Sequence, residues 1–435
     1  MKKVIVLLLL CLLLSSCGEK TTPKQAGITP HYEAQQPTLS PTEPEDPDAI
    51  LAYRRDVVEA EMRRAMSVLW TPAEDMSYSL YSGSMGPEID MEIVPERVIH
   101  LKAGRIYRGL PYSHGSGSAY SFLSYATAQD ENGVYTISDL RGESLTGYPK
   151  DGPWSQARIG SDCVDTVFWA WSKVSNSITF TGTGEMTDIY GCVKVGEYTC
   201  NIPKYTESTK PICQDNGEEV MYKAYAQLQK GDAIVLYTKA SGGHTVMIVS
   251  TNIYYNEDGS INPDVSTVTI IENKSESQKT DDCYFDSKLG QNVYICGSLD
   301  TVWTFKQIYQ KGYLPVTCKE LIDPSPLDQE SVSLSQDPVS LDQLLGSTIN
   351  ASHRIANAQI TIYSGDLVIQ QATLFGRELN CRQLQLSQLL NPIEQAVILG
   401  SIDPDGLSKG AYHCVVTCRL GTGNLHTISQ FDFTI

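Results

Sequence analysis

The chain has 435 residues, a formal net charge of −18 and an isoelectric point of about 4.8. A field of that sign repels phosphate backbones and anionic headgroups, which argues against nucleic acid as a partner. Hydrophobic residues make up 41% of the sequence and charged residues 19%. The chain can therefore bury a core, and its length favours two or three domains.

The N-terminus has the pattern of an export signal. Lys2 and Lys3 precede an apolar run over residues 4–14, which is too short to span a bilayer comfortably. The run ends in Leu14-Ser15-Ser16-Cys17-Gly18, which resembles the lipobox of bacterial lipoproteins. The resemblance implies a signal peptide over residues 1–17 and a diacylglycerol on Cys17 that anchors the protein to the outer face of the cytoplasmic membrane, at the bacterial cell surface. The alternative is an ordinary secretory peptide with an incidental cysteine.

Residues 18–45 are rich in Pro, Thr, Gln and Glu and predict a disordered tether. Asp46-Pro47 then predicts a helix start, and apolar residues at helical spacing continue the helix to Trp70-Thr71-Pro72. The charged residues of this segment fall mostly on the opposite face, which predicts a solvated surface; they are Arg54, Arg55, Asp56, Glu59, Arg63 and Arg64.

The middle of the chain changes from helical to strand-like patterns. Residues 73–100 are predicted as loop, 120–125 as a short helix, 131–134 as a hairpin turn and 182–225 as an irregular insertion over a cleft. Strands are predicted at 232–237, 245–251, 268–271 and 293–296, with a helix at 303–310. Helices first and a mostly antiparallel sheet second indicate an α+β domain over residues 46–325.

The last part of the chain differs in pattern. Residues 326–340, which are rich in Ser, Gln and Asp, predict a linker. Short alternating strands separated by glycine turns fill residues 341–435 and predict a β-sandwich of immunoglobulin type.

One cysteine stands where a turn runs into an apolar helix, in Gly160-Ser161-Asp162-Cys163-Val164-Asp165. The unpaired N–H groups and the positive dipole end of a helix N-terminus stabilise a thiolate. A buried structural cysteine is the alternative for this motif by itself.

A histidine and two polar residues follow on the predicted strands. Gly242-Gly243-His244 leads an apolar strand, and the strand at 268–271 ends in Glu272-Asn273. Cysteine, histidine and a polar residue in this order suggest a thiol nucleophile, its base and the group that orients the base. Glu272 and Asn273 would point to opposite faces of a strand, so only one can face the ring, and Glu272 is preferred slightly.

These motifs resemble the papain-like NlpC and CHAP families of bacterial cell-wall peptidases and amidases, over roughly residues 100–318. Gly231-Asp232 is similar to their "GD" strand, Gly243-His244 to their histidine strand, and Pro111-Tyr112 to an element whose tyrosine lies beside the nucleophile. The usual Asp-Cys-Ser-Gly is here Asp162-Cys163-Val164-Asp165.

The resemblance implies a papain-like cysteine hydrolase that needs neither metal nor cofactor and cuts an amide bond of peptidoglycan, as a stem-peptide endopeptidase or an amidase. Cys163 would attack the carbonyl, His244 would carry the proton, and Glu272 or Asn273 would orient the ring. The Cys163 N–H would hold the oxyanion, and the other expected oxyanion or substrate contacts are Tyr112, Ser161 and Asp162. Two alternatives stay open: a non-catalytic papain-fold surface lipoprotein that binds glycan or protein, and a transglutaminase-like acyl transferase.

Ten cysteines remain after Cys11 and Cys17 are set aside. An exported chain could pair some of them, and the neighbours Cys192/Cys200 and Cys283/Cys296 are the first candidates. The connectivity does not follow from the sequence.

Overall fold

The structure is a computed structural model that describes residues 44, 46–79, 98–113, 118–138, 141–144, 155–157, 160–179, 182–200, 208–238, 242–275, 278, 281–375, 381–390 and 397–435. The expected signal peptide with Cys17, and nearly all of the expected tether, lie outside these residues. Within the described ranges, no helix has the length and apolar character needed to cross a membrane.

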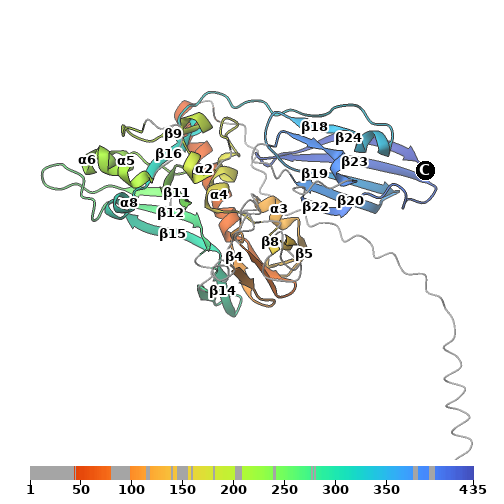
Figure 1. The fold of residues 1–435 in the computed structure, drawn as a ribbon, viewed down its shortest axis with the longest axis horizontal. Coiled ribbons are helices and arrows are strands. Elements are labelled where there is room, and N and C mark those ends of the chain that lie inside the picture. The colour runs from red at the N-terminus through yellow and green to blue at the C-terminus, as the bar shows by residue number, and fades with distance from the viewer. Residues whose placement is uncertain are drawn as a thin grey trace, which may run out of the picture.

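The chain is a mixed α/β structure with several antiparallel sheets, and one six-stranded sheet lies at one end of the molecule (Figure 1). Every neighbouring pair in this six-stranded sheet is antiparallel. The strands, in spatial order, are β15 (Gly297–Thr304), β12 (Thr267–Asn273), β11 (Gly242–Asn252), β10 (Ala233–Thr238), β16 (Leu314–Cys318) and β9 (Cys192–Lys194).

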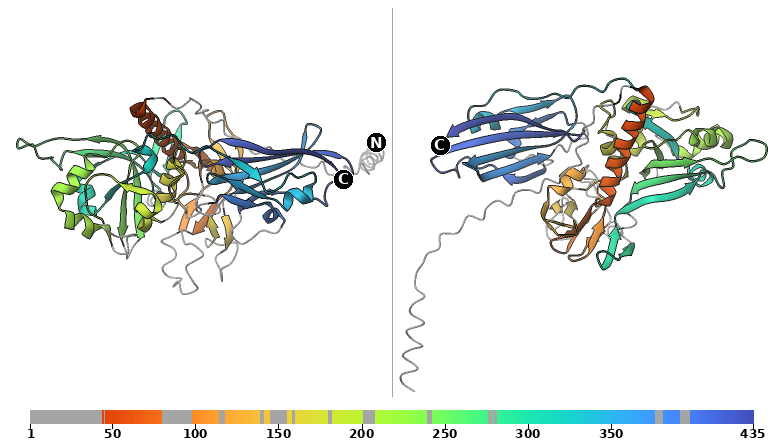
Figure 2. Two further views of the ribbon diagram at one scale, coloured as in Figure 1. Left: turned by 90° about the horizontal axis from the view of Figure 1, so that it is seen from above. Right: turned by 180° about the vertical axis from the view of Figure 1, so that it is seen from behind.

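Helices cover this sheet. Ala233, Ile234 and Val235 are consecutive and fully buried, so both faces of the sheet are packed. The long helix α2 (Pro47–Ser67) packs on α4 (Cys163–Trp171), and both contact β12 (Figure 2). Further helices in the described residues of this part are α5 (Thr209–Asn216), α6 (Glu218–Tyr225) and α8 (Phe305–Lys311).

Two polar contacts fix α4 and α2 to the start of β10. The indole Nε1 of Trp171 donates to the carbonyl of Gly231 at 2.7 Å. Arg55 forms a buried ion pair with Asp232, with 2.8 Å between Nη1 and Oδ1. The aspartate of the expected "GD" strand is thus a structural anchor for α2.

The prediction of a solvated charged face on α2 is wrong for Arg54 and Arg55. Arg54 is fully buried, and its guanidinium donates to the carbonyls of Glu320, Asp323 and Ser325. A guanidinium can enter a core when its N–H groups meet carbonyls of an incoming segment, and a pattern of charged residues does not reveal that segment.

Strands from residues 69–157 build two further sheets, one of which also contains two strands from residues 283–295. One is mixed and six-stranded, in the order β13 (Cys283–Asp286), β14 (Gln291–Ile295), β4 (Ile106–Arg108), β1 (Leu69–Pro72), β6 (Tyr135–Ile137) and β5 (Ala126–Gln129). The other orders β3 (Val98–Leu101), β2 (Met76–Ser79), β8 (Ser155–Ala157) and β7 (Arg141–Ser144). The loop expected at 73–100 is corrected at 76–79 and 98–100, which are strands, and residues 80–97 lie outside the described residues. Trp70, expected to end the helix, is a buried strand residue that stacks on Tyr107, with ring centroids 5.0 Å apart.

Other predicted elements have mixed outcomes. The short helix appears as α3 (Ala119–Leu123), and the hairpin turn at 131–134 joins β5 to β6. The stretch 182–225 is not irregular throughout: besides α5, α6 and β9 it has two 3-10 turns, η2 (Thr183–Glu185) and η3 (Asp188–Tyr190). Strand β15, just before the expected helix at 303–310, was not predicted, because its polar and apolar residues alternate weakly.

The C-terminal part contains two antiparallel sheets that share one apolar core. One has five strands, β22 (Val397–Ser401), β20 (Leu367–Phe375), β19 (Ile355–Ser364), β23 (Ala411–Leu420) and β24 (Leu425–Thr434). The other has three: β17 (Val332–Leu334), β18 (Thr348–Ala351) and β21 (Gln383–Gln385), with α9 (Leu341–Leu345) and the turn η5 (Leu386–Leu389) beside them. The expected linker therefore contains β17, and residues 332–435 are called the C-terminal domain below.

Candidate active site

Helix α4 begins at Cys163, and the cysteine is 3% exposed. Asp162 is the N-cap, and its carboxylate accepts the N–H groups of Val164 at 3.0 Å and Asp165 at 2.8 Å. The cap satisfies two of the free N–H groups of the first turn and fixes where the helix starts. The sulfur therefore lies at the positive end of a short, fully buried helix.

The segment before α4 lies directly against residues 111–113. Ser161 donates its N–H to the carbonyl of Pro111 and accepts the N–H of Ser113 at its own carbonyl, as a parallel bridge. A Cβ at Gly160 would lie 2.2 Å from Ser113 Oγ, so only glycine allows this approach. The bridge places the hydroxyl of Tyr112 3.9 Å from Sγ of Cys163, within reach of a hydrogen bond to sulfur.

His244 lies near the start of β11, in the part of the strand that pairs with β10. The preceding Gly243 has no room for a side chain, because an added Cβ would lie 2.0 Å from Thr183 Oγ1. The following residues, Thr245 to Ile248, are fully buried and anchor the strand. The imidazole is 23% exposed, so the site opens to solvent on the side of the ring.

The carboxylate of Glu272 on β12 contacts the ring of His244, with 2.6 Å between Oε2 and Nε2. The register pairs Met247 with Ile271, and continuing it puts His244 and Glu272 on one face of the sheet as a diagonal pair. Asn273 points to the other face and donates its amide to the carbonyl of Ser161 at 2.8 Å. Of the two expected candidates for the third position, Glu272 is therefore the one that touches His244.

The three groups shift one another's ionisation. Burial would lower the pKa of His244, but hydrogen bonds to Cys163 and Glu272 outweigh it and raise the pKa to about 10. Burial would raise the pKa of Glu272, but the hydrogen bond and charge of His244, with Lys274, lower it to about 2. This arrangement favours a protonated imidazole beside Cys163.

Two residues that hold Glu272 were not predicted. The ammonium of Lys274 lies 3.0 Å from Oε1 of Glu272, and the hydroxyl of Ser298 donates to the same oxygen at 3.1 Å. Lys274 follows directly on the Glu272-Asn273 motif, which could have identified it. Ser298 lies on β15, the strand that the sequence pattern missed, so no signal pointed to it.

The remaining expected residues divide into two groups. Tyr112 faces the sulfur, and burial, followed by the charges of Cys163 and Asp162, raises the pKa of its phenol well above the usual range. Ser161 and Asp162 make local structural contacts. Ser161 Oγ accepts a hydrogen bond from the hydroxyl of Thr166 at 2.9 Å, and Asp162 caps α4.

A cavity of about 410 Å³ lies away from these residues. It is lined by side chains of both the α/β part and the C-terminal domain, such as Lys173 and His353, and by none of Cys163, His244 and Glu272.

The structure thus brings together a thiol, an imidazole and a carboxylate from a helix and two neighbouring strands. In the described part of the chain, no group of three or more His, Cys, Asp or Glu side chains is arranged to hold a metal ion. No protein-family model matches the chain, and no curated protein matches it.

Proposed function

We propose that the protein is a cysteine hydrolase that cuts an amide bond through Cys163, His244 and Glu272. The observation that carries the proposal is the position of His244, whose Nε2 lies 2.6 Å from the Glu272 carboxylate and whose imidazole pKa is raised by Cys163 and Glu272 together. A thiol, a base and a group that orients the base are the parts that acyl transfer to sulfur requires.

In the proposed reaction the thiolate of Cys163 attacks the amide carbonyl, and the His244 imidazolium gives its proton to the leaving amine. A thioester remains on the enzyme. Water then attacks the thioester as His244 takes a proton from it, and breakage of the C–S bond releases the carboxylic acid and restores the thiolate beside the imidazolium. The N–H of Cys163 would hold the oxyanion that forms on the carbonyl oxygen, with the Tyr112 hydroxyl as a neighbouring donor.

The proposed substrate is peptidoglycan, cut within the stem peptide or at its amide link to the glycan. The substrate class comes from the resemblance of the Gly160-Ser161-Asp162-Cys163 and Gly243-His244 motifs to NlpC and CHAP enzymes, whose papain-like fold we propose for the α/β part. A protein held at the outer face of the membrane by Cys17 would meet this substrate. The immunoglobulin-type sandwich is our proposal for the fold of the C-terminal domain.

The test is digestion of purified muropeptides by the full chain, with products identified by mass spectrometry. Cleavage by the wild type that disappears in Cys163→Ala and falls strongly in His244→Ala is the expected result. The masses of the products identify the bond. Cys283→Ala is the matched control, because Cys283 is an exposed thiol on another sheet and its loss should leave the rate unchanged.

Two results would contradict the proposal. Cleavage that survives in Cys163→Ala would exclude the thiol as nucleophile. The second contradicting result combines two observations on the wild type. It cleaves no muropeptide, and its Cys163 reacts with iodoacetamide at the rate of an ordinary thiol, unchanged in His244→Ala. The protein would then be a non-catalytic binding protein. Incorporation of an amine into a glutamine peptide, in place of hydrolysis, would identify an acyl transferase.

A further inference from the structure

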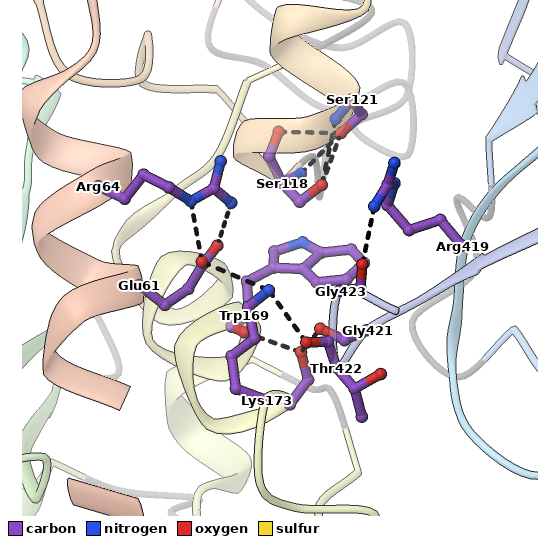
Figure 3. Close-up of polar contacts among 11 residues, drawn as sticks. Glu61, Arg64, Ser118, Ser121, Trp169, Lys173, Arg419, Gly421, Thr422 and Gly423 are labelled. Carbon is purple, nitrogen blue, oxygen red and sulfur yellow. Dashed lines mark hydrogen bonds and ion pairs between the residues drawn. The ribbon is translucent and has the colours of Figure 1, made fainter. Parts of the chain in front are cut away.

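The helix that carries Cys163 is buried from two sides by different parts of the chain. Asp165 and Trp169 on α4 are only 4% and 5% exposed. α2 covers one side of the helix, and the C-terminal domain covers another (Figure 3). Asp165 is also where the motif departs from the Asp-Cys-Ser-Gly of the families that it resembles, so the departure falls on this covered surface.

Arg354 of the C-terminal domain lies over the ring of Trp169, with its guanidinium carbon 4.1 Å from the ring centroid. Arg354 is 6% exposed. Burial lowers the pKa of its guanidinium to about 9, and the charge of Asp165 acts in the opposite direction. A cation stacked on an indole away from water is among the stronger contacts of this type. The charge of Asp165 on α4 therefore acts on Arg354 across the two parts of the molecule.

A turn at residues 421–423 touches the last part of the same helix. The hydroxyl of Ser172, the C-cap residue of α4, donates to the carbonyls of Trp169 at 2.8 Å and Gly421 at 3.2 Å. The ammonium of Lys173 donates to the carbonyl of Thr422 at 3.2 Å. An added Cβ at Gly421 would lie 3.0 Å from Ser172 Oγ, so the turn approaches α4 closely.

Lys173 also connects this turn to α2. Its Nζ lies 3.4 Å from Glu61, and Glu61 is held by Arg64 at 2.6 Å, as Figure 3 shows. The Lys173 and Glu61 side chains are only 4% and 7% exposed. Because buried charges are tolerated only when they are paired, this network constrains the end of α4 between α2 and the C-terminal domain.

We propose that the C-terminal domain is a positioning part of the active site. Arg354 and the turn at residues 421–423, together called the α4 clamp below, hold the nucleophile helix in place against the histidine strand. This inference rests on the proposed function. It assigns the C-terminal domain a task within the reaction, in place of a spacer or a separate wall-binding module.

The geometry explains why a contact at the end of α4 affects its first residue. Cys163 lies on the helix, whereas His244 and Glu272 lie on β11 and β12, so the distance from sulfur to imidazole depends on where the helix lies relative to the sheet. A helix of nine residues moves as one body. Displacement by a fraction of an ångström would weaken the thiol–imidazole contact.

The experiment measures alkylation of Cys163 in the full chain across pH, with the site followed by peptide mass spectrometry because other cysteines are present. Arg354→Gln removes the stacked charge, and Gly421→Ala pushes the turn away from Ser172. In the wild type, reaction at acidic pH reports a thiolate paired with imidazolium. We expect both variants to react about 10- to 100-fold more slowly at acidic pH, with profiles shifted toward an ordinary thiol.

Arg382→Gln is the matched control. Arg382 also reaches from the C-terminal domain to the α/β part, but its guanidinium contacts Asn176 beyond the end of α4. Its profile should equal that of the wild type. If circular dichroism shows that Arg354→Gln does not fold, the alkylation profile of Gly421→Ala alone tests the positioning role.

A folded variant of the α4 clamp with the wild-type alkylation profile would overturn this inference and leave the proposed function untouched. A wild type whose Cys163 behaves as an ordinary thiol would instead overturn the proposed function, and the positioning role with it.

Discussion

Glu272 contacts His244 through a carboxylate oxygen 2.6 Å from Nε2, while the adjacent Asn273 turns its amide to the segment that precedes Cys163. Two neighbours on one strand thus serve two different sides of the same site. Glu272 fixes the ring, and Asn273 fixes the approach to the nucleophile helix.

Glu272→Gln should slow the reaction of Cys163 because a neutral amide stabilises the imidazolium less than a carboxylate does. We expect the rate of muropeptide cleavage to fall by about 100-fold or more. Ser298→Ala removes only the hydrogen bond to Oε1 and should reduce the rate far less. Glu257→Gln, in an exposed turn, is the control. Equal rates for Glu272→Gln and the control would show that the carboxylate has no part in the reaction.

The stability of the protein should depend on pH through His244 and Glu272. The raised pKa of His244 gives stability that is fully present below pH 6.5 and is lost as the pH rises through about 10. The lowered pKa of Glu272 gives stability that is present above pH 4.5 and is lost as the pH falls through about 2. Both contributions are complete between pH 4.5 and 6.5.

Urea unfolding at a series of pH values checks this dependence. The difference in unfolding free energy between the wild type and His244→Ala should be largest in that window and shrink toward alkaline pH. His413→Ala, at an exposed histidine beside Asp432, is the control. A difference that does not change with pH would mean that the ring contributes by packing alone.

Arg54 should be among the residues of α2 that matter most for stability. Arg54→Met leaves the carbonyls of residues 320, 323 and 325 without their donor, and we expect a loss of about 3 kcal/mol or more. Arg63→Met breaks a pair with Glu59 one turn away on the helix and an exposed pair with Asp300, and should cost about 1 kcal/mol or less. Urea unfolding of both variants measures the difference, and similar losses would contradict the assignment.

Cys192 and Cys318 should form a disulfide when the chain folds in an oxidising medium. They lie opposite each other on β9 and β16. Val195 donates its N–H to the carbonyl of Pro315, so by alternation the cysteine pair is a non-hydrogen-bonded one, in which the Cα atoms are about 4.5 Å apart. A disulfide fits this spacing.

Refolding of the reduced chain with glutathione disulfide tests the pairing. The two thiols would lose two protons and two electrons, and the oxidant would become two molecules of glutathione. Burial raises the pKa of Cys192 to about 12, so the folded thiol should react slowly and oxidation should occur during folding. Non-reduced peptide mapping should find residues 192 and 318 linked. A link to Cys200, the first candidate from sequence, would contradict the register argument.

The sequence predicts the parts of the site that depend on local pattern. A glycine turn before an apolar helix marks Cys163, and a glycine pair before an apolar strand marks His244, because glycine permits close backbone approach in both places. The choice between Glu272 and Asn273 depends on strand register, which includes an irregularity of β12 against β15 near Glu272, and no local pattern encodes it.

Contacts between distant segments could not be predicted from the sequence for the same reason. Arg54 fits a solvated helix face by its charge, and only the approach of residues 320–325 explains its burial. Arg354 lies in a strand-rich region without any signal that it would stack on Trp169. Such pairings follow from the tertiary fold.

The closeness of residues 421–423 to α4 has a consequence for the time course of folding. Cys163 and Gly421 are roughly 250 residues apart in the chain, and contacts between segments so far apart form late. Helix α4 can therefore form early, with its sulfur not yet held against the imidazole. The reactive form of Cys163 would then arise only in the last stage of folding, and a chain caught before that stage would carry an ordinary thiol.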